Sequence, residues 1–184
     1  MKPGTPRAAP TKLLMTPELE RLARWLRLLG CDVNMYRGQP LAIYPAAYGD
    51  GRVVVTGNTR IVPSSLVRII HVKPVQLEQQ LKRVVRALKL RAAAPFLFSR
   101  CGACNTMLAE IPKARIKTRV PPYVFKTQER FTTCPTCHRI YWTATHHDRA
   151  QAFLVKLGVA KRSRAGRTRA TAKTIRRSRH ALRR

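Results

Sequence analysis

Two Cys-x-x-Cys pairs constrain the fold of this chain more than any other feature, because four thiols that share one ion must meet at a single point. The pairs are Cys101-Gly-Ala-Cys104 and Cys134-Pro-Thr-Cys137. Each pair can direct two thiolates at a tetrahedral Zn²⁺, and the 29 residues between the pairs leave room for an inserted hairpin. Two disulfides or four free thiols are the other arrangements that the spacing allows. We predict one structural Zn²⁺, because four thiolate ligands leave no open position for water.

The charge of the chain restricts its partners. The sequence contains 37 Lys and Arg residues against 8 Asp and Glu residues, a formal net charge of +29. A chain this basic repels itself unless an anion neutralises it, and the phosphates of nucleic acid match such a charge density. An anionic membrane surface is the alternative. Since no apolar run approaches the roughly 18 residues of a membrane span, we expect nucleic acid, and neither a membrane nor a small-molecule substrate, as the partner.

Strand and helix patterns alternate over residues 13–95, which we predict to be one α/β domain. Short apolar runs predict strands at 12–15, 31–36, 52–56 and 66–72. Helical periodicity predicts a helix after the cap residue Thr16, a weak helix at 40–48 that contains Pro45, and a helix that begins at Pro74. This alternation is typical of a parallel sheet flanked by helices. Functional groups in such sheets lie at the carboxyl ends of strands, which here are Thr16 and the Gly57-Asn58 turn.

The rest of the chain divides into three segments. Residues 96–158 are predicted to form the zinc ribbon, with a helix at 145–158 after it. Residues 1–12 are predicted to be a basic N-terminal arm, for which a mitochondrial presequence is the alternative. Residues 159–184 are predicted to be a basic RNA-binding tail that folds on contact. Its expected RNA-contacting side chains are Lys161, Arg162, Arg164, Arg167, Arg169, Lys173, Arg176, Arg177 and Arg179.

Several segments, in this order, resemble the Mut-seven C-terminal RNase domain family. They are LERLARWLRLLGCDV (19–33), GRVVVTGNTR (51–60), RCGACNTML (100–108), VPPYVF (120–125) and FTTCPTCHRIYW (131–142). The likeness covers roughly residues 13–157. It implies a PIN-like nuclease domain, here with a parallel sheet, followed by a zinc ribbon.

The chain departs from the family at the positions that would bind catalytic metal. The family carries an acid after the first strand, where this chain has Thr16, and another after the third strand, where it has Asn58. Further acids of the family align near Pro40 and Leu41. A hydroxyl and an amide do not replace the charge that holds Mg²⁺, so we expect metal-dependent cleavage to be lost. A nuclease that uses Glu18 or Glu20 instead is the alternative.

The first predicted helix carries arginines at helical spacing, Arg21, Arg24 and Arg27, which we predict to face RNA; a solvated helix face is the alternative. Cys31 and Trp25 are expected to be packing residues. Tyr141 and Trp142 are also expected to pack, although they could stack on a base. Together these features predict a non-catalytic structural rRNA-binding protein of an organellar, mitochondrial ribosome, with rRNA and neighbouring ribosomal proteins as partners. The alternative is an active metal-dependent ribonuclease, or an RNA-processing or ribosome-assembly factor.

Overall fold

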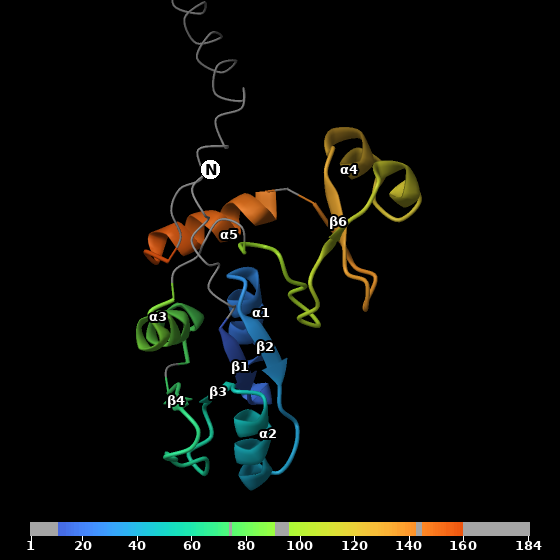
Figure 1. Ribbon diagram of the computed structural model, residues 1–184. Helices are drawn as coiled ribbons and strands as arrows, with labels where there is room; N and C mark the ends of the chain where they lie inside the picture. The colour runs from blue at the N-terminus through green and yellow to red at the C-terminus, as the bar shows by residue number, and fades with distance from the viewer. Residues whose placement is uncertain (1–10, 74, 91–95, 143–144, 160–184) are drawn as a thin grey trace, which may run out of the picture.

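The computed structural model describes residues 11–159, apart from 74, 91–95 and 143–144 (Figure 1). Nearly all of the predicted basic arm and basic tail therefore lies outside the described residues. No helix among the described residues is long and apolar enough to cross a membrane.

Four parallel strands form the sheet of the first half, in the order β2-β1-β3-β4. Their bounds are Lys12–Met15 for β1, Asp32–Met35 for β2, Val53–Thr56 for β3 and Ile69–His71 for β4. Each lies inside the run that the sequence predicts. The predicted α/β fold with a parallel sheet is thus confirmed, and the last strand is shorter than the predicted 66–72.

Helices cover both faces of this sheet, which explains why its strands are apolar runs rather than alternating ones. On β1, Leu13 and Met15 join one core cluster, and Leu14 joins the other, because successive side chains of a strand point to opposite faces. The helices are α1 (Glu20–Leu28), α2 (Ile43–Gly49) and α3 (Leu77–Leu88). Short 3₁₀ turns, η1 (Pro17–Leu19) and η2 (Pro40–Ala42), precede α1 and α2.

The structure corrects the predicted start of one helix and shows how the weak helix that contains Pro45 forms. The helix after β4 begins at Leu77, three residues later than predicted, and Pro74 lies outside the described residues. The weak helix at 40–48 forms as η2 and α2 in spite of Pro45. Pro45 lies in the first turn of α2, where a backbone N–H would have no intrahelical acceptor. The missing N–H of proline therefore costs this helix no hydrogen bond.

The second sheet is antiparallel and has the order β5-β6-β7. One Cys-x-x-Cys pair precedes β5, and the other lies between β6 and β7. The strands of this sheet are Ala109–Glu110, Phe131–Thr133 and Ile140–Trp142. The 3₁₀ turn η3 (Lys113–Ile116) and the helix α4 (Pro122–Thr127) lie between β5 and β6. Ile116, Val120 and Phe131 form the small core of this ribbon.

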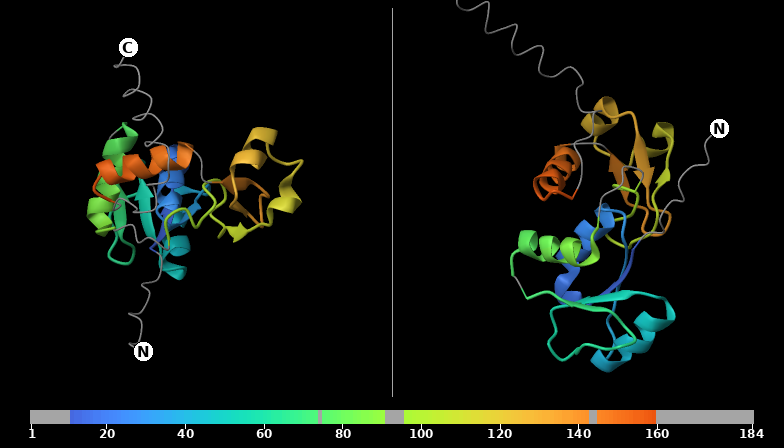
Figure 2. Two further views of the ribbon diagram at one scale, coloured as in Figure 1. Left: turned by 90° about the horizontal axis from the view of Figure 1, so that it is seen from above. Right: turned by 60° about the vertical axis from the view of Figure 1, so that its left-hand side comes forward.

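The last helix, α5 (Thr145–Lys156), packs on the first half of the chain rather than on the ribbon. Leu154 is fully buried in the core cluster that contains α1 and α3, and the Phe153 ring lies 4.7 Å from the ring of Trp25. Figure 2 shows α5 beside α1 and α3. The helix that the sequence groups with the ribbon over 96–158 thus contributes to the core of the α/β half. The expectation that Trp25 is a packing residue is confirmed.

Candidate metal centre and sheet-edge site

The four cysteine sulfurs converge on one point. All four Sγ atoms lie within 4.8 Å of one another, with Cys101 to Cys137 at 3.5 Å and Cys104 to Cys134 at 3.3 Å. Zinc–sulfur bonds of about 2.3 Å in a tetrahedron place sulfurs about 3.8 Å apart, so the donor set fits one such ion. All four cysteines are free thiols, which excludes the two-disulfide arrangement in this structure. The predicted four-cysteine ligand set is placed to bind one metal ion.

Both Cys-x-x-Cys pairs have the same backbone geometry. The residue after each pair, Asn105 or His138, has a left-handed φ of 73° or 56°. Its N–H donates to the carbonyl of the first cysteine of the pair, at 3.0 Å for Asn105 and 2.9 Å for His138. Non-glycine residues adopt this conformation at a cost, and asparagine tolerates it best. The two turns are thus matched loops that direct paired sulfurs to one centre.

Two of the cysteine sulfurs have pKa values that are shifted in opposite directions. Burial acts to raise the pKa of Cys104, but hydrogen bonds with Thr106 and with neighbouring sulfurs outweigh it and lower the pKa to about 6. An Arg139 backbone hydrogen bond lowers the pKa of Cys137, yet burial and the other sulfurs raise it to about 12. Four thiolates this close repel one another, so the fully ionised set requires a divalent ion between them.

The carboxyl ends of β1 and β3 in the parallel sheet bring two threonines and a glutamate together. The Thr16 hydroxyl donates to Glu18 Oε1 and lies 2.9 Å from the Thr56 hydroxyl. The Gly57 N–H donates to the same carboxylate oxygen at 2.8 Å. Thr16 follows the extended backbone that precedes η1, but its hydroxyl forms no cap hydrogen bond with that turn, unlike the predicted N-cap. It holds Glu18 instead.

Glu18 is an ionised carboxylate at this edge. Partial burial acts to raise its pKa, but hydrogen bonds from Thr16, from its own backbone, from Gly57 and from Thr56 outweigh this effect and lower the pKa. The sequence identified Glu18 only as an acid that a nuclease could use, because nothing local to Pro17-Glu18 shows that β3 lies beside it. The tertiary contact between β1 and β3 creates the site.

The other positions expected to hold catalytic acids are neutral here. Asn58 Oδ1 accepts from the Arg60 N–H at 2.9 Å, and the Asn58 N–H donates to Thr56 Oγ1 at 3.0 Å, so the residue forms a local turn. Pro40 and Leu41 begin η2, with Leu41 exposed. Among the described residues, the cysteine cluster is the only group of three or more His, Cys, Asp or Glu side chains close enough to share an ion.

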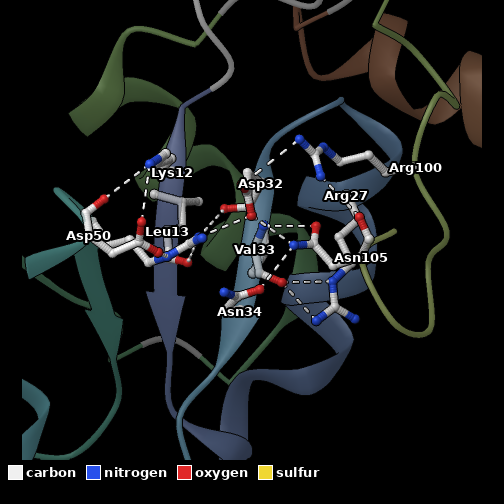
Figure 3. A network of polar contacts seen from close by, with 10 residues as sticks. Lys12, Leu13, Arg27, Asp32, Val33, Asn34, Asp50, Arg100 and Asn105 are labelled. Carbon is white, nitrogen blue, oxygen red and sulfur yellow. Dashed lines mark hydrogen bonds and ion pairs between the residues drawn. The ribbon is translucent and has the colours of Figure 1, made fainter. Parts of the chain in front are cut away.

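Two of the remaining acids lie at the amino ends of the strands, at the opposite edge from Glu18 (Figure 3). Asp32 and Asp50 both pair with Arg52, and Asp50 also accepts from Lys12. Burial acts to lower the pKa of Arg52, but the hydrogen bonds and charges of Asp32 and Asp50 outweigh it and raise the pKa. Arg52 is 8% exposed, which makes this a structural ion-pair network. The sequence did not single it out.

Arg27 belongs to the junction between the sheet and the ribbon, and the prediction that it faces RNA is wrong. It is 3% exposed, and its guanidinium donates to the Val33 carbonyl at 2.9 and 3.0 Å (Figure 3). The same guanidinium donates to the carbonyls of Gly102 and Ala103 at 3.0 and 2.8 Å. Two of those carbonyls lie inside the first Cys-x-x-Cys loop. Helical spacing groups Arg27 with Arg21 and Arg24, but the ribbon covers this one position of α1.

Asn105 completes the junction from the ribbon side. Its Oδ1 accepts from the Val33 N–H at 2.9 Å, and its Nδ2 donates to Asp32 at 2.7 Å and to Asn34 at 3.0 Å. Val33 therefore has both backbone groups bound, one by Arg27 and one by Asn105. The first Cys-x-x-Cys loop is tied to β2 through polar contacts on two sides.

The exposed basic side chains that the structure describes lie outside this junction. Arg21 and Arg24 are exposed on α1, with Arg24 paired to Glu20 at 3.1 Å, so either RNA binding or solvent exposure suits them. The predicted tail contacts from Lys161 onward lie outside the described residues. A groove of about 820 Å³ between β4 and α3 is a further basic surface, which the sequence pattern does not reveal. Its basic lining residues are Arg68, His71, Lys82, Arg83 and Arg86.

Comparison with protein-family models finds a match to the Mut7-C RNAse domain over residues 11–154. No curated protein and no solved structure matches the chain. The matched span contains the whole parallel sheet, the edge where Thr16 and Glu18 meet, and all four cysteines of the candidate metal centre. The family model covers most of the chain and agrees with the resemblance seen in its motifs, so this chain belongs to the Mut7-C RNase domain family of PIN-like ribonucleases.

Proposed function

We propose that the protein binds RNA without metal-dependent cleavage. The observation that carries this proposal is the composition of the sheet edge, where a single carboxylate, Glu18, lies among neutral Thr16, Thr56 and Asn58. Metal-assisted phosphodiester cleavage requires several oxygen ligands of high charge around Mg²⁺. One Glu18 oxygen already accepts hydrogen bonds from Thr16 and Gly57, which further reduces its capacity to bind an ion.

The charge of the described surface and the family both support the proposed RNA binding. The groove between β4 and α3 has five basic side chains in its lining and no acidic one. Arg68 and Arg83 donate to the carbonyls of Ala87 and His71, so they hold the two walls together. The Arg86 residue is exposed, and its side chain has no hydrogen-bond or ion-pair partner among the described residues. Such a groove suits the phosphates of an RNA backbone.

The finer proposal is a structural role on rRNA in a ribosome. A net charge of +29 on 184 residues and basic segments at both ends are typical of chains that order against rRNA. An organellar, mitochondrial ribosome is the proposed setting, by analogy with former enzymes recruited as added subunits. Co-sedimentation of the endogenous protein with a ribosomal subunit at physiological salt, in a mitochondrial fraction, is the expected result. Sedimentation free of ribosomal particles would contradict the ribosomal role.

The single ion is proposed to be a structural Zn²⁺ held by the four cysteines. Metal analysis should find about one zinc per chain. Cys134→Ser should release the ion and unfold the ribbon, because zinc binding contributes folding free energy directly. Replacement of Cys31, which is buried and outside the cluster, by Ala is the matched control and should leave the zinc content unchanged. A protein without zinc and with the four thiols in disulfides would overturn this assignment.

A second candidate, an active nuclease, has one observation in its favour, the ionised Glu18 at the expected edge. The test is cleavage of single-stranded RNA and tRNA with Mg²⁺ or Mn²⁺ by the purified full chain. We expect none. Glu18→Gln and Glu20→Gln are the matched pair, because Glu20 is an exposed acid paired with Arg24 outside the edge. Cleavage that Glu18→Gln removes and Glu20→Gln retains would establish the second candidate.

The groove assignment has its own test. Arg86→Gln should weaken binding to structured RNA and reduce the slope of log affinity against log salt, because each phosphate contact releases counterion. Arg115→Gln, an exposed arginine on η3 outside the groove, is the matched control and should leave the slope unchanged. Equal slopes for wild type, Arg86→Gln and Arg115→Gln would show that the groove is not part of the RNA interface.

A further inference from the structure

A second hollow lies where the ribbon meets the α/β half, away from both sites described above. It is a cleft of about 920 Å³. Leu28 of α1 and Ala150 of α5 lie on one wall, and residues of β5, β6 and β7 line the other. Thr16, Glu18 and the four cysteines are not among its lining residues. Its volume is in the range of clefts that hold a ligand of nucleotide size.

The apolar part of this cleft is aromatic. Phe131 of β6 is buried, and Trp142 of β7 is only partly buried. The two rings have centroids 6.5 Å apart at an angle of 54°, so they are tilted rather than stacked on each other. A partly covered indole in a cleft wall offers a surface on which an unpaired base can stack.

A buried arginine in the same wall lacks a partner for one of its donors. The Arg100 side chain is 12% exposed, and its Nε is buried with no hydrogen-bond partner among the described residues. One terminal nitrogen donates to the Asn105 carbonyl at 3.0 Å, and the other lies 3.9 Å from Asp32. The enclosed Nε is out of reach of a ligand in the cleft, so Arg100 can offer a ligand only its positive charge and the terminal nitrogen that lies 3.9 Å from Asp32.

The cleft also contains acceptors. Glu110 of β5 and Glu129 both line it, and Glu129 pairs with Lys113 at 3.0 Å. The Glu110 carboxylate has no such partner among the described residues. The cleft therefore combines a stacking ring, the positive charge of Arg100 and a carboxylate acceptor, and the exposed Arg130 in its lining can meet a phosphate.

We propose that this cleft binds an unstacked guanine base of the RNA. Guanine offers two N–H donors, N1 and N2, on its Watson–Crick edge, which suit the Glu110 carboxylate. Its O6 and N7 acceptors suit the Arg100 guanidinium, and its ring can stack on Trp142. Uracil has no amino group to donate and a smaller ring to stack. The inference rests on the proposed RNA binding and adds to it a site that reads one base, whereas the groove beside β4 contacts phosphates.

The experiment uses the full zinc-loaded chain with Trp25→Phe, which leaves Trp142 as the single tryptophan. The protein is titrated with GMP, AMP, CMP and UMP, and binding is measured by calorimetry and by Trp142 fluorescence. We expect GMP to bind at least about fivefold more tightly than UMP. Glu110→Gln should remove this preference. Glu129→Gln is the matched control, an acid in the same lining that is already paired with Lys113, and it should retain the preference.

Two results would overturn the guanine site. One is the absence of nucleotide binding by calorimetry in a folded protein that still binds structured RNA with a steep salt dependence. The other is equal affinity for the four nucleotides, unchanged by Glu110→Gln. Either result would leave the proposed RNA binding intact. Loss of RNA binding in the unmodified full chain would instead refute the proposed function itself.

Discussion

At the scale of single residues, Thr16 determines how the carboxylate at the sheet edge is stabilised. Thr16 is 6% exposed, and its hydroxyl donates to the Glu18 carboxylate. The sequence motifs imply that an acid would stand at that position in a metal-dependent nuclease of this kind. A hydroxyl stabilises the nearby carboxylate without any ion, whereas a second carboxylate would repel it. The edge is therefore stable without a cation, which an acidic edge is not.

Thr16→Asp tests this argument. It should lower the free energy of unfolding by about 2 kcal/mol, because two carboxylates then share a partly buried site. Added Mg²⁺ or Mn²⁺ should restore part of the loss, since an ion that binds only the folded state stabilises it. Urea unfolding with and without the ion measures both effects. Thr118→Asp, at an exposed position in the ribbon, should show neither. Full stability of Thr16→Asp without a cation would contradict the Thr16–Glu18 contact.

Asp32 makes a pH-dependent contribution at the other edge of the sheet. Burial acts to raise its pKa, but hydrogen bonds from Arg52 and Asn105 and the charges of Arg52 and Arg100 outweigh it and lower the pKa. A carboxyl with a lowered folded-state pKa adds stability above its unfolded pKa of about 3.9, and this stability is lost as pH falls through the folded value.

Asp32→Asn should therefore destabilise the protein most near neutral pH, by about 3 kcal/mol, because the buried Arg52 loses one of its two carboxylate partners. The difference from wild type should narrow as pH falls from about 4 through the lowered folded-state pKa of Asp32. Urea unfolding at several pH values measures the difference. Glu129→Gln, which removes a largely exposed pair, should give a small difference throughout. A difference independent of pH would show that the Asp32 charge is not what stabilises the fold.

At the scale of elements, α1 joins the two sheets. Its apolar face packs on the parallel sheet through Leu22 and Leu26, and Arg27 at its last turn binds carbonyls of the first Cys-x-x-Cys loop. Burial and a neighbouring positive charge lower the pKa of Arg27, while the nearby cysteines act to raise it. The helix thus positions the metal centre through the backbone of its ligand loop.

Arg27→Lys should weaken both folding and metal retention. Lysine cannot donate in the forked geometry that reaches Val33, Gly102 and Ala103 together, so buried carbonyls lose their donors at a cost of about 1–3 kcal/mol. Zinc release to a chelator should be faster than in wild type. Arg21→Lys, on the exposed face of the same helix, should change neither quantity. Unchanged zinc release in Arg27→Lys would mean that the junction does not support the ligand loop.

At the scale of the whole molecule, charge outside the described residues should govern affinity for RNA. Residues 161–184 contain 11 of the 37 basic side chains and no acid, and residues 1–160 keep a net charge of +18. Deletion of residues 161–184 should flatten the salt dependence of binding to structured RNA, by roughly 0.7–0.9 in log–log slope for each lost phosphate contact. It should not abolish binding. Filter binding at several salt concentrations measures the slope, and an unchanged slope would exclude the tail from the interface.

The sequence was sufficient for features that depend on local pattern. The strands of the parallel sheet, the four-cysteine cluster and the burial of Cys31 were all predicted and are confirmed. Apolar runs, helical spacing and Cys-x-x-Cys pairs involve residues that are close together in the chain, so the sequence alone reveals them. The family membership of the chain also rests on such motifs.

Only the tertiary structure decided which side chains meet. Glu18 joins Thr16 and Thr56 because β1 and β3 are adjacent, and Arg27 is buried because the ribbon docks on α1. Helix α5 packs on the α/β core although it follows the ribbon in sequence. These outcomes depend on contacts between segments 40 to 130 residues apart, as between Thr16 and Thr56 or between Trp25 and Phe153. No local periodicity encodes such pairs, because they are selected by how whole apolar and polar surfaces fit together on folding.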